Sequence, residues 1–228
     1  MTNKDFVLLL ENIAKMKTYY IKGGFGHVLK ASNKKRLIDQ YKYNKDRADK
    51  INALDPGTFA FDCCGLVKGA LWGFTGDRVK TYGGAVYKAN GLDDVNESGL
   101  LKLCKNVTTD LSKKEVGYFL YMSGHCGIYA GNGKVIECTP ALKSGVQITD
   151  FNRVKWTKCG KLPFIQYEMP ASNKPTTTYS VFHIVRRGEN LTTIARKHGF
   201  KDYKELWALN PEIKNPHLIY VGQRIRIK

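Results

Sequence analysis

The chain carries one cysteine-containing segment and one histidine whose types and positions suit nucleophilic catalysis. Residues 61–67 read Phe-Asp-Cys-Cys-Gly-Leu-Val, and residues 125–129 read His-Cys-Gly-Ile-Tyr. The first pattern predicts that a cysteine lies at the start of a helix, and the second predicts that His125 lies at the start of a strand. Only the thiolate form of cysteine is an effective nucleophile, and a helix N-terminus and a neighbouring imidazolium both favour that form. The two segments together indicate a thiol nucleophile with a histidine base.

The local sequence leaves open which cysteine is the nucleophile, Cys63 or Cys64. Asp62 can cap the helix, so that the residue after it lies on the first turn, where backbone N–H groups favour a thiolate. Gly65 allows another segment of backbone to approach closely at the same turn. Each cysteine can equally be a small buried hydrophobic residue.

The segment that follows His125 predicts a β-hairpin that sets this histidine against Glu137. Strands over residues 125–130 and 134–138 flank Gly-Asn-Gly at residues 131–133, a strong turn signal. A two-residue turn would place His125 and Glu137 on opposite faces, whereas a three-residue loop places them diagonally on one face, about 7–8 Å apart. We favour the three-residue loop, because it gathers the apolar residues of both strands on the other face. Glu137 can then orient the imidazole as the third member of a triad.

The remaining elements before residue 170 complete an α+β domain. Helical periodicity predicts an amphipathic helix over residues 5–17, and the apolar positions over 66–71 supply the buried face of the cysteine helix. The apolar, aromatic run over residues 116–122 predicts a strand. Residues 30–55 are polar and rich in Lys, Asp and Tyr, which predicts a solvent-exposed helical insertion.

Composition changes sharply after residue 169. Residues 170–178 contain two prolines and small polar side chains without a large apolar residue, which is typical of a linker. We therefore expect one domain over residues 1–169 and a small one over 179–228. The small domain shows a βααβ pattern, with strands at 182–185 and 224–227 and helices that begin at 191 and 203.

Composition also limits the class of protein and its partners. The 228 residues are 43% hydrophobic and 11% aromatic, which excludes wholesale disorder. A formal charge of +17 attracts polyanions such as nucleic acid, anionic lipid or teichoic acid, but no block of like charge is long enough for a nucleic-acid tail. The six cysteines form no Cys-x-x-Cys pair and have no histidine cluster beside them. We therefore expect free buried thiols in a reducing compartment, no metal site and no cofactor.

Targeting and membrane signals are weak in this sequence. The apolar run at residues 6–10 is too short for the core of a signal peptide, and no other run approaches the length of a membrane span. We expect a protein that is made in the cytoplasm, has no membrane partner, and reaches any external target only after release.

Three motifs in this order resemble the NlpC-type cell-wall cysteine peptidases, a papain-like superfamily. They are Tyr-x-x-Gly-Gly from Tyr20, the Asp-Cys-Cys-Gly segment that contains Cys63, and the run from His125 to Glu137. The resemblance implies that Cys63 is the nucleophile, that His125 is the base and that Tyr20 lies near the oxyanion. The third position, usually His and sometimes Asn or Gln in the family, is Glu137 here. The stretch between Tyr20 and Phe61 is also longer than the family's usual short loop.

The C-terminal domain resembles a lysin motif (LysM), a small module that binds N-acetylglucosamine-containing glycans in a shallow groove. Its opening run begins at residue 183, and its ending includes Trp-x-Leu-Asn-Pro from residue 207 and Gly-Gln-x-Ile from residue 222. The resemblance implies that a turn and a loop form the groove. The turn residues are Gly188, Glu189, Asn190 and Leu191, and the loop residues are Leu218, Ile219 and Tyr220.

Together the two resemblances imply a peptidoglycan hydrolase. It would cut an amide bond of the stem peptide, at the D-glutamyl–diamino acid bond, while the LysM module holds it on the wall glycan. A phage endolysin released by a holin fits the absence of an export signal, and an effector delivered by secretion machinery fits it equally. One alternative is an N-acetylmuramoyl-L-alanine amidase, and another is a wall-binding protein with an inactive catalytic fold. A basic nucleic-acid binder ranks last, because the chain shows no recognition element for nucleic acid.

Overall fold

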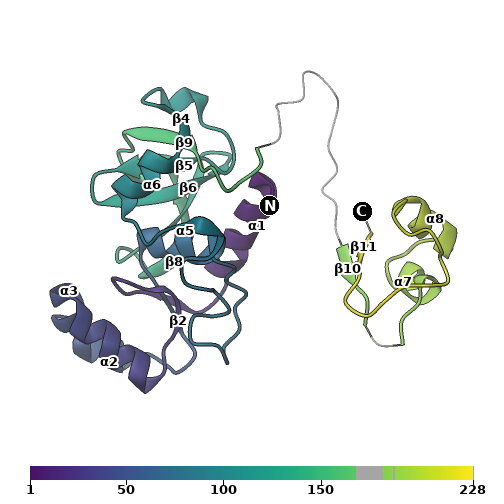
Figure 1. The fold of residues 1–228 in the computed structure, drawn as a ribbon, viewed down its shortest axis with the longest axis horizontal. Coiled ribbons are helices and arrows are strands. Elements are labelled where there is room, and N and C mark those ends of the chain that lie inside the picture. The colour runs from purple at the N-terminus through teal and green to yellow at the C-terminus, as the bar shows by residue number, and fades with distance from the viewer. Residues whose placement is uncertain (168–181, 187, 228) are drawn as a thin grey trace. The chain divides into compact units, whose positions relative to one another are not determined.

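The computed structural model describes residues 1–167, 182–186 and 188–227. The chain divides into two units, Met1–Met169 and Pro170–Lys228 (Figure 1), and each unit has its own hydrophobic core. The predicted linker over residues 170–178 lies outside the described residues. In the described part of the chain, every helix is too short or too polar to cross a bilayer.

The larger unit is built on a six-stranded antiparallel sheet, and its α+β class is confirmed. The strand order is β4-β9-β5-β6-β7-β8. Two helices, α1 (Asn3–Ala14) and α5 (Cys63–Leu71), pack against the β6, β7 and β8 part of this sheet (Figure 1). The strands are β4 (Lys105–Thr108), β5 (Phe119–Met122), β6 (His125–Gly131), β7 (Lys134–Thr139), β8 (Gly145–Asp150) and β9 (Lys158–Lys161).

Helix α5 forms where the sequence predicts it, and its glycines explain how closely it is packed. All nine of its residues are buried. A Cβ atom at Gly65 would overlap the carbonyl oxygen of Gly24, and one at Gly69 would overlap that of Phe25, so only glycine fits at these positions. The helix is therefore pressed directly onto strand β2 (Phe25–Val28). This contact fixes the N-terminus of α5, and with it the two cysteines.

A three-stranded sheet packs against α5 through its strands β2 and β3, and the insertion adds three short helices to the unit. The sheet has the order β1-β3-β2, with β1 at Thr18–Tyr20 and β3 at Phe59–Phe61. The insertion forms three helices, α2 (Ala31–Gln40), α3 (Lys42–Lys45) and α4 (Ala48–Asn52). The predicted helical insertion is confirmed, and most of its residues are exposed, but Leu37 and Ile51 are buried in a small core that also includes Ile21, Leu29 and Ala60. Helix α6 (Glu97–Leu103) and three 3-10 turns, Ala89–Gly91, Leu111–Lys113 and Phe151–Arg153, complete the unit.

The β6–β7 hairpin has the predicted register but not the predicted loop. Tyr129 pairs with Val135, which is the register that places residues 125 and 137 on one face. Gly131 pairs with Lys134, so the loop is a two-residue turn at 132–133, with positive φ values of 49° and 68°. A β-bulge between Tyr129 and Gly131 supplies the extra residue that restores the register.

The smaller unit has the predicted βααβ order. Strands β10 (Phe182–Ile184) and β11 (Arg224–Arg226) pair antiparallel, and helices α7 (Leu191–Lys197) and α8 (Tyr203–Ala208) lie between them in the chain. Asn210 is fully buried and ties the unit together. Its amide donates to the carbonyls of Leu206 (2.7 Å) and Arg226 (2.9 Å), and its oxygen accepts from the Arg226 N–H (2.6 Å).

Candidate active site

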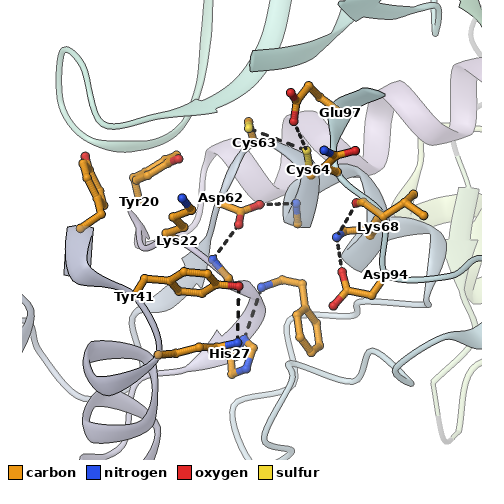
Figure 2. Close-up of a pocket in the computed structure, with 18 of the residues that line it drawn as sticks. Tyr20, Lys22, His27, Tyr41, Asp62, Cys63, Cys64, Lys68, Asp94 and Glu97 are labelled. Carbon is orange, nitrogen blue, oxygen red and sulfur yellow. Dashed lines mark hydrogen bonds and ion pairs between the residues drawn. The ribbon is translucent and has the colours of Figure 1, made fainter. Parts of the chain in front are cut away.

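The larger unit contains a cleft of about 820 Å³ at the N-terminal end of α5. Figure 2 shows Cys63, Cys64, Asp62 and Tyr20 gathered at this cleft. The insertion forms one wall, with Arg36, Gln40, Tyr41 and Tyr43. The long stretch between Tyr20 and Phe61 therefore shapes the space that a substrate would enter.

Asp62 fixes the turn that presents the cysteines. Its Oδ1 accepts from the N–H of Gly65 (2.6 Å) as the helix cap, and its Oδ2 accepts from the N–H of Gly23 (2.7 Å). Burial and the nearby Cys63 charge raise the pKa of Asp62 to about 6, although the two backbone hydrogen bonds oppose this rise. The carboxylate thus joins α5 to the segment after Tyr20, and Cys63 is the first residue of the helix.

The two adjacent cysteines have opposite acid–base properties. Hydrogen bonds from the thiols of Cys126 and Cys64, together with the nearby His125, hold the pKa of Cys63 far below its ordinary range. The hydrogen bond from Cys126 also lowers the pKa of Cys64, but the charge of Cys63 and burial outweigh it, and the net pKa lies well above its ordinary value. At neutral pH, Cys63 is therefore the thiolate and Cys64 a neutral thiol.

His125 is held between a carboxylate and an aromatic ring. Its Nε2 lies 2.5 Å from Oε2 of Glu137, and its ring stacks on Trp156 with the centroids 5.5 Å apart. Burial lowers the pKa of His125, but the Cys63 thiolate and Glu137 outweigh burial and raise it to about 9. Because Glu137 occupies Nε2, Nδ1 is the ring nitrogen left for chemistry at Cys63.

Glu137 is almost fully buried, at 1% exposure. Besides His125, it accepts hydrogen bonds from Thr149 and from Arg153, whose guanidinium nitrogens lie 3.1 and 2.5 Å from its two oxygens. Burial raises the pKa of Glu137, but these hydrogen bonds outweigh it and hold the pKa below its usual value. The predicted placement of His125 and Glu137 on one face is confirmed. The catalytic role of Glu137 stays a prediction.

Three residues that support this site carry no motif in the sequence: Thr149, Arg153 and Trp156. Thr149 lies on β8, Arg153 lies in the 3-10 turn that follows β8, and Trp156 lies just beyond that turn. None stands next to a catalytic motif in the chain. The only available signal was that a buried carboxylate on β7 needs donors from the neighbouring strand.

Tyr20 lies on β1 at the mouth of the cleft, and in Figure 2 its hydroxyl points toward Cys63. Burial, and then the negative charge of Cys63, raise the pKa of Tyr20 well above its ordinary value. Among the described residues, that hydroxyl has no hydrogen-bond partner. It is therefore a protonated donor that faces Cys63.

The predicted glycan-binding residues of the smaller unit lie in different environments. Gly188 has a φ of +87°, and Asn190 caps α7 by accepting from the N–H of Thr193 (2.9 Å). Glu189 accepts from the N–H of Arg186 (2.8 Å) and lies 2.6 Å from Nε2 of His183, so its side chain supports the turn itself.

The apolar residues of this predicted groove differ in how far their side chains are exposed. Leu191 is only 1% exposed, so its side chain belongs to the core and only its backbone can contribute to a groove. Leu218 and Tyr220 are exposed, and Ile219 is half-buried. A shallow hollow in this unit is lined instead by other residues, among them Trp207. Glycan binding by the predicted residues stays a prediction.

Two solved structures align with part of this chain. NlpC1 and NlpC2 from Trichomonas vaginalis align with TM-scores of 0.39 and 0.40, at 15% and 14% sequence identity. Each alignment covers 70% of this chain and 43% or 45% of the other.

Sequence relatives and a family model both point to the C-terminal part. The endolysin of Bacillus phage B103 is 46% identical over 56 residues, and that of Bacillus phage PZA is 44% identical over 57 residues. These matches cover 25% of this chain and span 21% and 20% of the two relatives, so this chain spans about a fifth of their length. The family model of the LysM domain matches residues 183–228, and the predicted lysin motif of the smaller unit is thereby confirmed.

Proposed function

We propose that this protein is a peptidoglycan hydrolase of the cysteine peptidase type. The observation that carries the proposal is the position of Cys63 at the start of α5, on a cleft, together with a His125 whose Nε2 lies 2.5 Å from Glu137. In this arrangement the pKa of Cys63 is lowered and that of His125 is raised. The same chain carries a LysM domain. Two relatives named endolysin share part of the sequence, which supports a role in wall lysis.

The proposed mechanism begins when the Cys63 thiolate attacks an amide carbonyl of the stem peptide. Backbone N–H groups at the start of α5 and the Tyr20 hydroxyl stabilise the oxyanion that forms. The His125 imidazolium then donates its proton to the leaving amine, and the C–N bond breaks to leave a thioester on Cys63. Water attacks the thioester while His125 accepts its proton, which releases the acid and restores the thiolate–imidazolium pair.

Glu137 is a positioning residue in this scheme. It fixes the ring orientation of His125 through Nε2 and favours the charged imidazolium, while Arg153 and Thr149 hold the carboxylate in place. A glutamate can therefore serve where the resembling family usually has a histidine.

Charged side chains of both signs line the cleft: Lys22, Arg36 and Lys68, and Asp62, Asp94 and Glu97. Lys22 and Arg36 can meet the free carboxylates of a stem peptide. We propose the D-glutamyl–diamino acid bond as the target. The LysM domain would hold the enzyme on the glycan, and the resulting high local concentration lets a module of modest affinity suffice. Action on the wall would follow release from the cell in which the protein is made.

The test compares the wild type with Cys63→Ala on purified sacculi, with turbidity and product masses as readouts. We expect clearing by the wild type, none by Cys63→Ala, and slower but measurable clearing by the matched variant Cys64→Ala, which removes one of the hydrogen bonds to Cys63 but keeps those from Cys126 and His125. Product masses separate an endopeptidase from an N-acetylmuramoyl-L-alanine amidase. Loss of activity in Cys64→Ala alone would contradict the assignment of the nucleophile. A wild type that binds sacculi without cutting them would favour a catalytically inactive wall-binding protein.

A further inference from the structure

Three cysteine sulfurs converge at the floor of the cleft. The Sγ atoms of Cys63, Cys64 and Cys126 all lie within 4.8 Å of one another. Cys64 Sγ is 3.9 Å from Cys63 Sγ and 3.8 Å from Cys126 Sγ, although Cys126 is 62 positions farther along the chain. Helix α5 supplies two of the sulfurs and strand β6 the third. The fold thus assembles a thiol cluster that the spacing of the cysteines in the sequence does not predict.

Two of the three separations within this cluster match those of a tetrahedral zinc–thiolate centre, and the third pair, Cys63 and Cys126, lies within 4.8 Å. Zinc–sulfur bonds are about 2.3 Å long, and tetrahedral geometry then places neighbouring sulfurs about 3.8 Å apart. The two measured sulfur–sulfur distances, 3.8 and 3.9 Å, agree with that edge. A disulfide would instead need two of the sulfurs to approach to about 2.05 Å. The arrangement of three sulfurs around one point suits a shared cation better than a bond between any two.

The surroundings of the cluster also suit a soft cation. Cys126 is fully buried, whereas Cys63 and Cys64 are 8% and 7% exposed and line the cleft. An ion can therefore reach the sulfurs from the cleft side, with Cys126 closing the site from behind. Thiolate ligands favour zinc and similar soft ions over magnesium or calcium, which prefer oxygen ligands.

We propose that Cys63, Cys64 and Cys126 form a binding site for Zn²⁺, with its fourth position open to the cleft. Binding replaces the protons of the Cys64 and Cys126 thiols by sulfur–zinc bonds, and these protons pass to solvent without any change of oxidation state. Since the ion occupies the sulfur of Cys63, metal binding blocks nucleophilic attack. This inhibitory consequence rests on the proposed function, whereas the binding itself does not.

The first experiment measures binding by the full-length, reduced, metal-free protein. Cd²⁺ serves as the probe, because the ultraviolet sulfur-to-cadmium charge-transfer band reports thiolate ligands and is blind to the histidines of the smaller unit. We expect one ion per chain, which Zn²⁺ displaces. Cys126→Ser should weaken binding by more than the about 10–100-fold that loss of an outer-shell partner costs, because it removes a direct ligand.

Cys104→Ser is the matched control, because Cys104 is a half-buried thiol outside the cluster. We expect it to bind Cd²⁺ as the wild type does. Cys64→Ser provides a second test should Cys126→Ser fail to fold, as judged by its thermal unfolding. An absent charge-transfer band, or a band of equal affinity in the cluster variants, would overturn the proposal.

The second experiment measures hydrolysis of sacculi in the presence of Zn²⁺. We expect stoichiometric Zn²⁺ to abolish wild-type activity and a chelator to restore it. If the protein binds Cd²⁺ but does not hydrolyse sacculi, the metal site stands and the proposed function is wrong. If it hydrolyses sacculi but binds no Cd²⁺, the proposed function stands and the metal site is wrong.

Discussion

Replacing Glu137 by Gln tests how the histidine is kept charged. The substitution keeps the shape of the side chain and an oxygen that can accept from Nε2 of His125, but it removes the negative charge 2.5 Å away. In the wild type, Cys63 and Glu137 together raise the pKa of His125 from 6.5 to about 9, against the effect of burial. At about 1.4 kcal/mol for each pH unit, this preference for the imidazolium amounts to ~3 kcal/mol.

Two anions, the Cys63 thiolate and the Glu137 carboxylate, together raise the pKa of His125. Loss of one of them should therefore lower this pKa by about 1 to 2. His125 must be protonated to donate to the leaving amine, so the alkaline limb of kcat/KM reports its pKa in the free enzyme. Glu137→Gln should therefore retain activity near pH 6 and lose it between about pH 7 and 9, where the wild type is still active.

The assay is the pH dependence of kcat/KM on soluble muropeptides, at a temperature where both proteins are folded. Glu115→Gln is the control, because Glu115 accepts from the Tyr118 hydroxyl (3.1 Å) and lies 3.5 Å from Lys161, away from the site. We expect its profile to match the wild type. An unmoved alkaline limb in Glu137→Gln would refute the claim that this carboxylate sets the charge of His125.

Three further predictions concern single side chains. Tyr20→Phe should lower kcat about 10- to 100-fold with little change in KM, because a donor to the oxyanion is lost; equal kcat values would exclude that role. Asp62→Ala should destabilise the larger unit by about 1–3 kcal/mol in urea unfolding, since the N–H groups of Gly65 and Gly23 lose their acceptor, whereas Asp62→Asn should cost less. Asn210→Ala should cost the smaller unit about 2–4 kcal/mol, because three buried hydrogen bonds disappear; unchanged unfolding in either alanine variant would contradict these assignments.

Sequence patterns predict most of the helices and strands, but they do not predict the β-bulge that sets the pairing register of the β6–β7 hairpin. The cysteine helix, the hairpin strands and the βααβ module follow from periodicity and turn residues. The predicted three-residue loop is wrong. The loop is a two-residue turn at residues 132–133, and the extra residue lies in a bulge between Tyr129 and Gly131. A bulge has no strong sequence signature, and its effect on the register is the same as that of a longer loop.

The choice between Cys63 and Cys64 could not be made from local sequence because it depends on a distant strand. Both residues lie on the first turn of α5 and are nearly equally buried. What separates them is the position of His125 and Cys126 on β6, which stabilises one thiolate and leaves the other thiol neutral. The same dependence on tertiary structure hid the sulfur cluster, because metal sites are recognised in sequences by short spacings.

In the proposed scheme, Cys126 has two opposed effects on Cys63, and its protonation state decides between them. As a thiol it donates a hydrogen bond that lowers the pKa of Cys63 and so favours the reactive anion. Burial and the neighbouring sulfurs raise its own pKa, so it keeps this proton at neutral pH. A zinc ion at the cluster would displace that proton and convert the same sulfur from a donor into a metal ligand. One set of atoms therefore supports attack when protonated and prevents it when metal-bound, and the free metal concentration that inhibits should fall as pH rises.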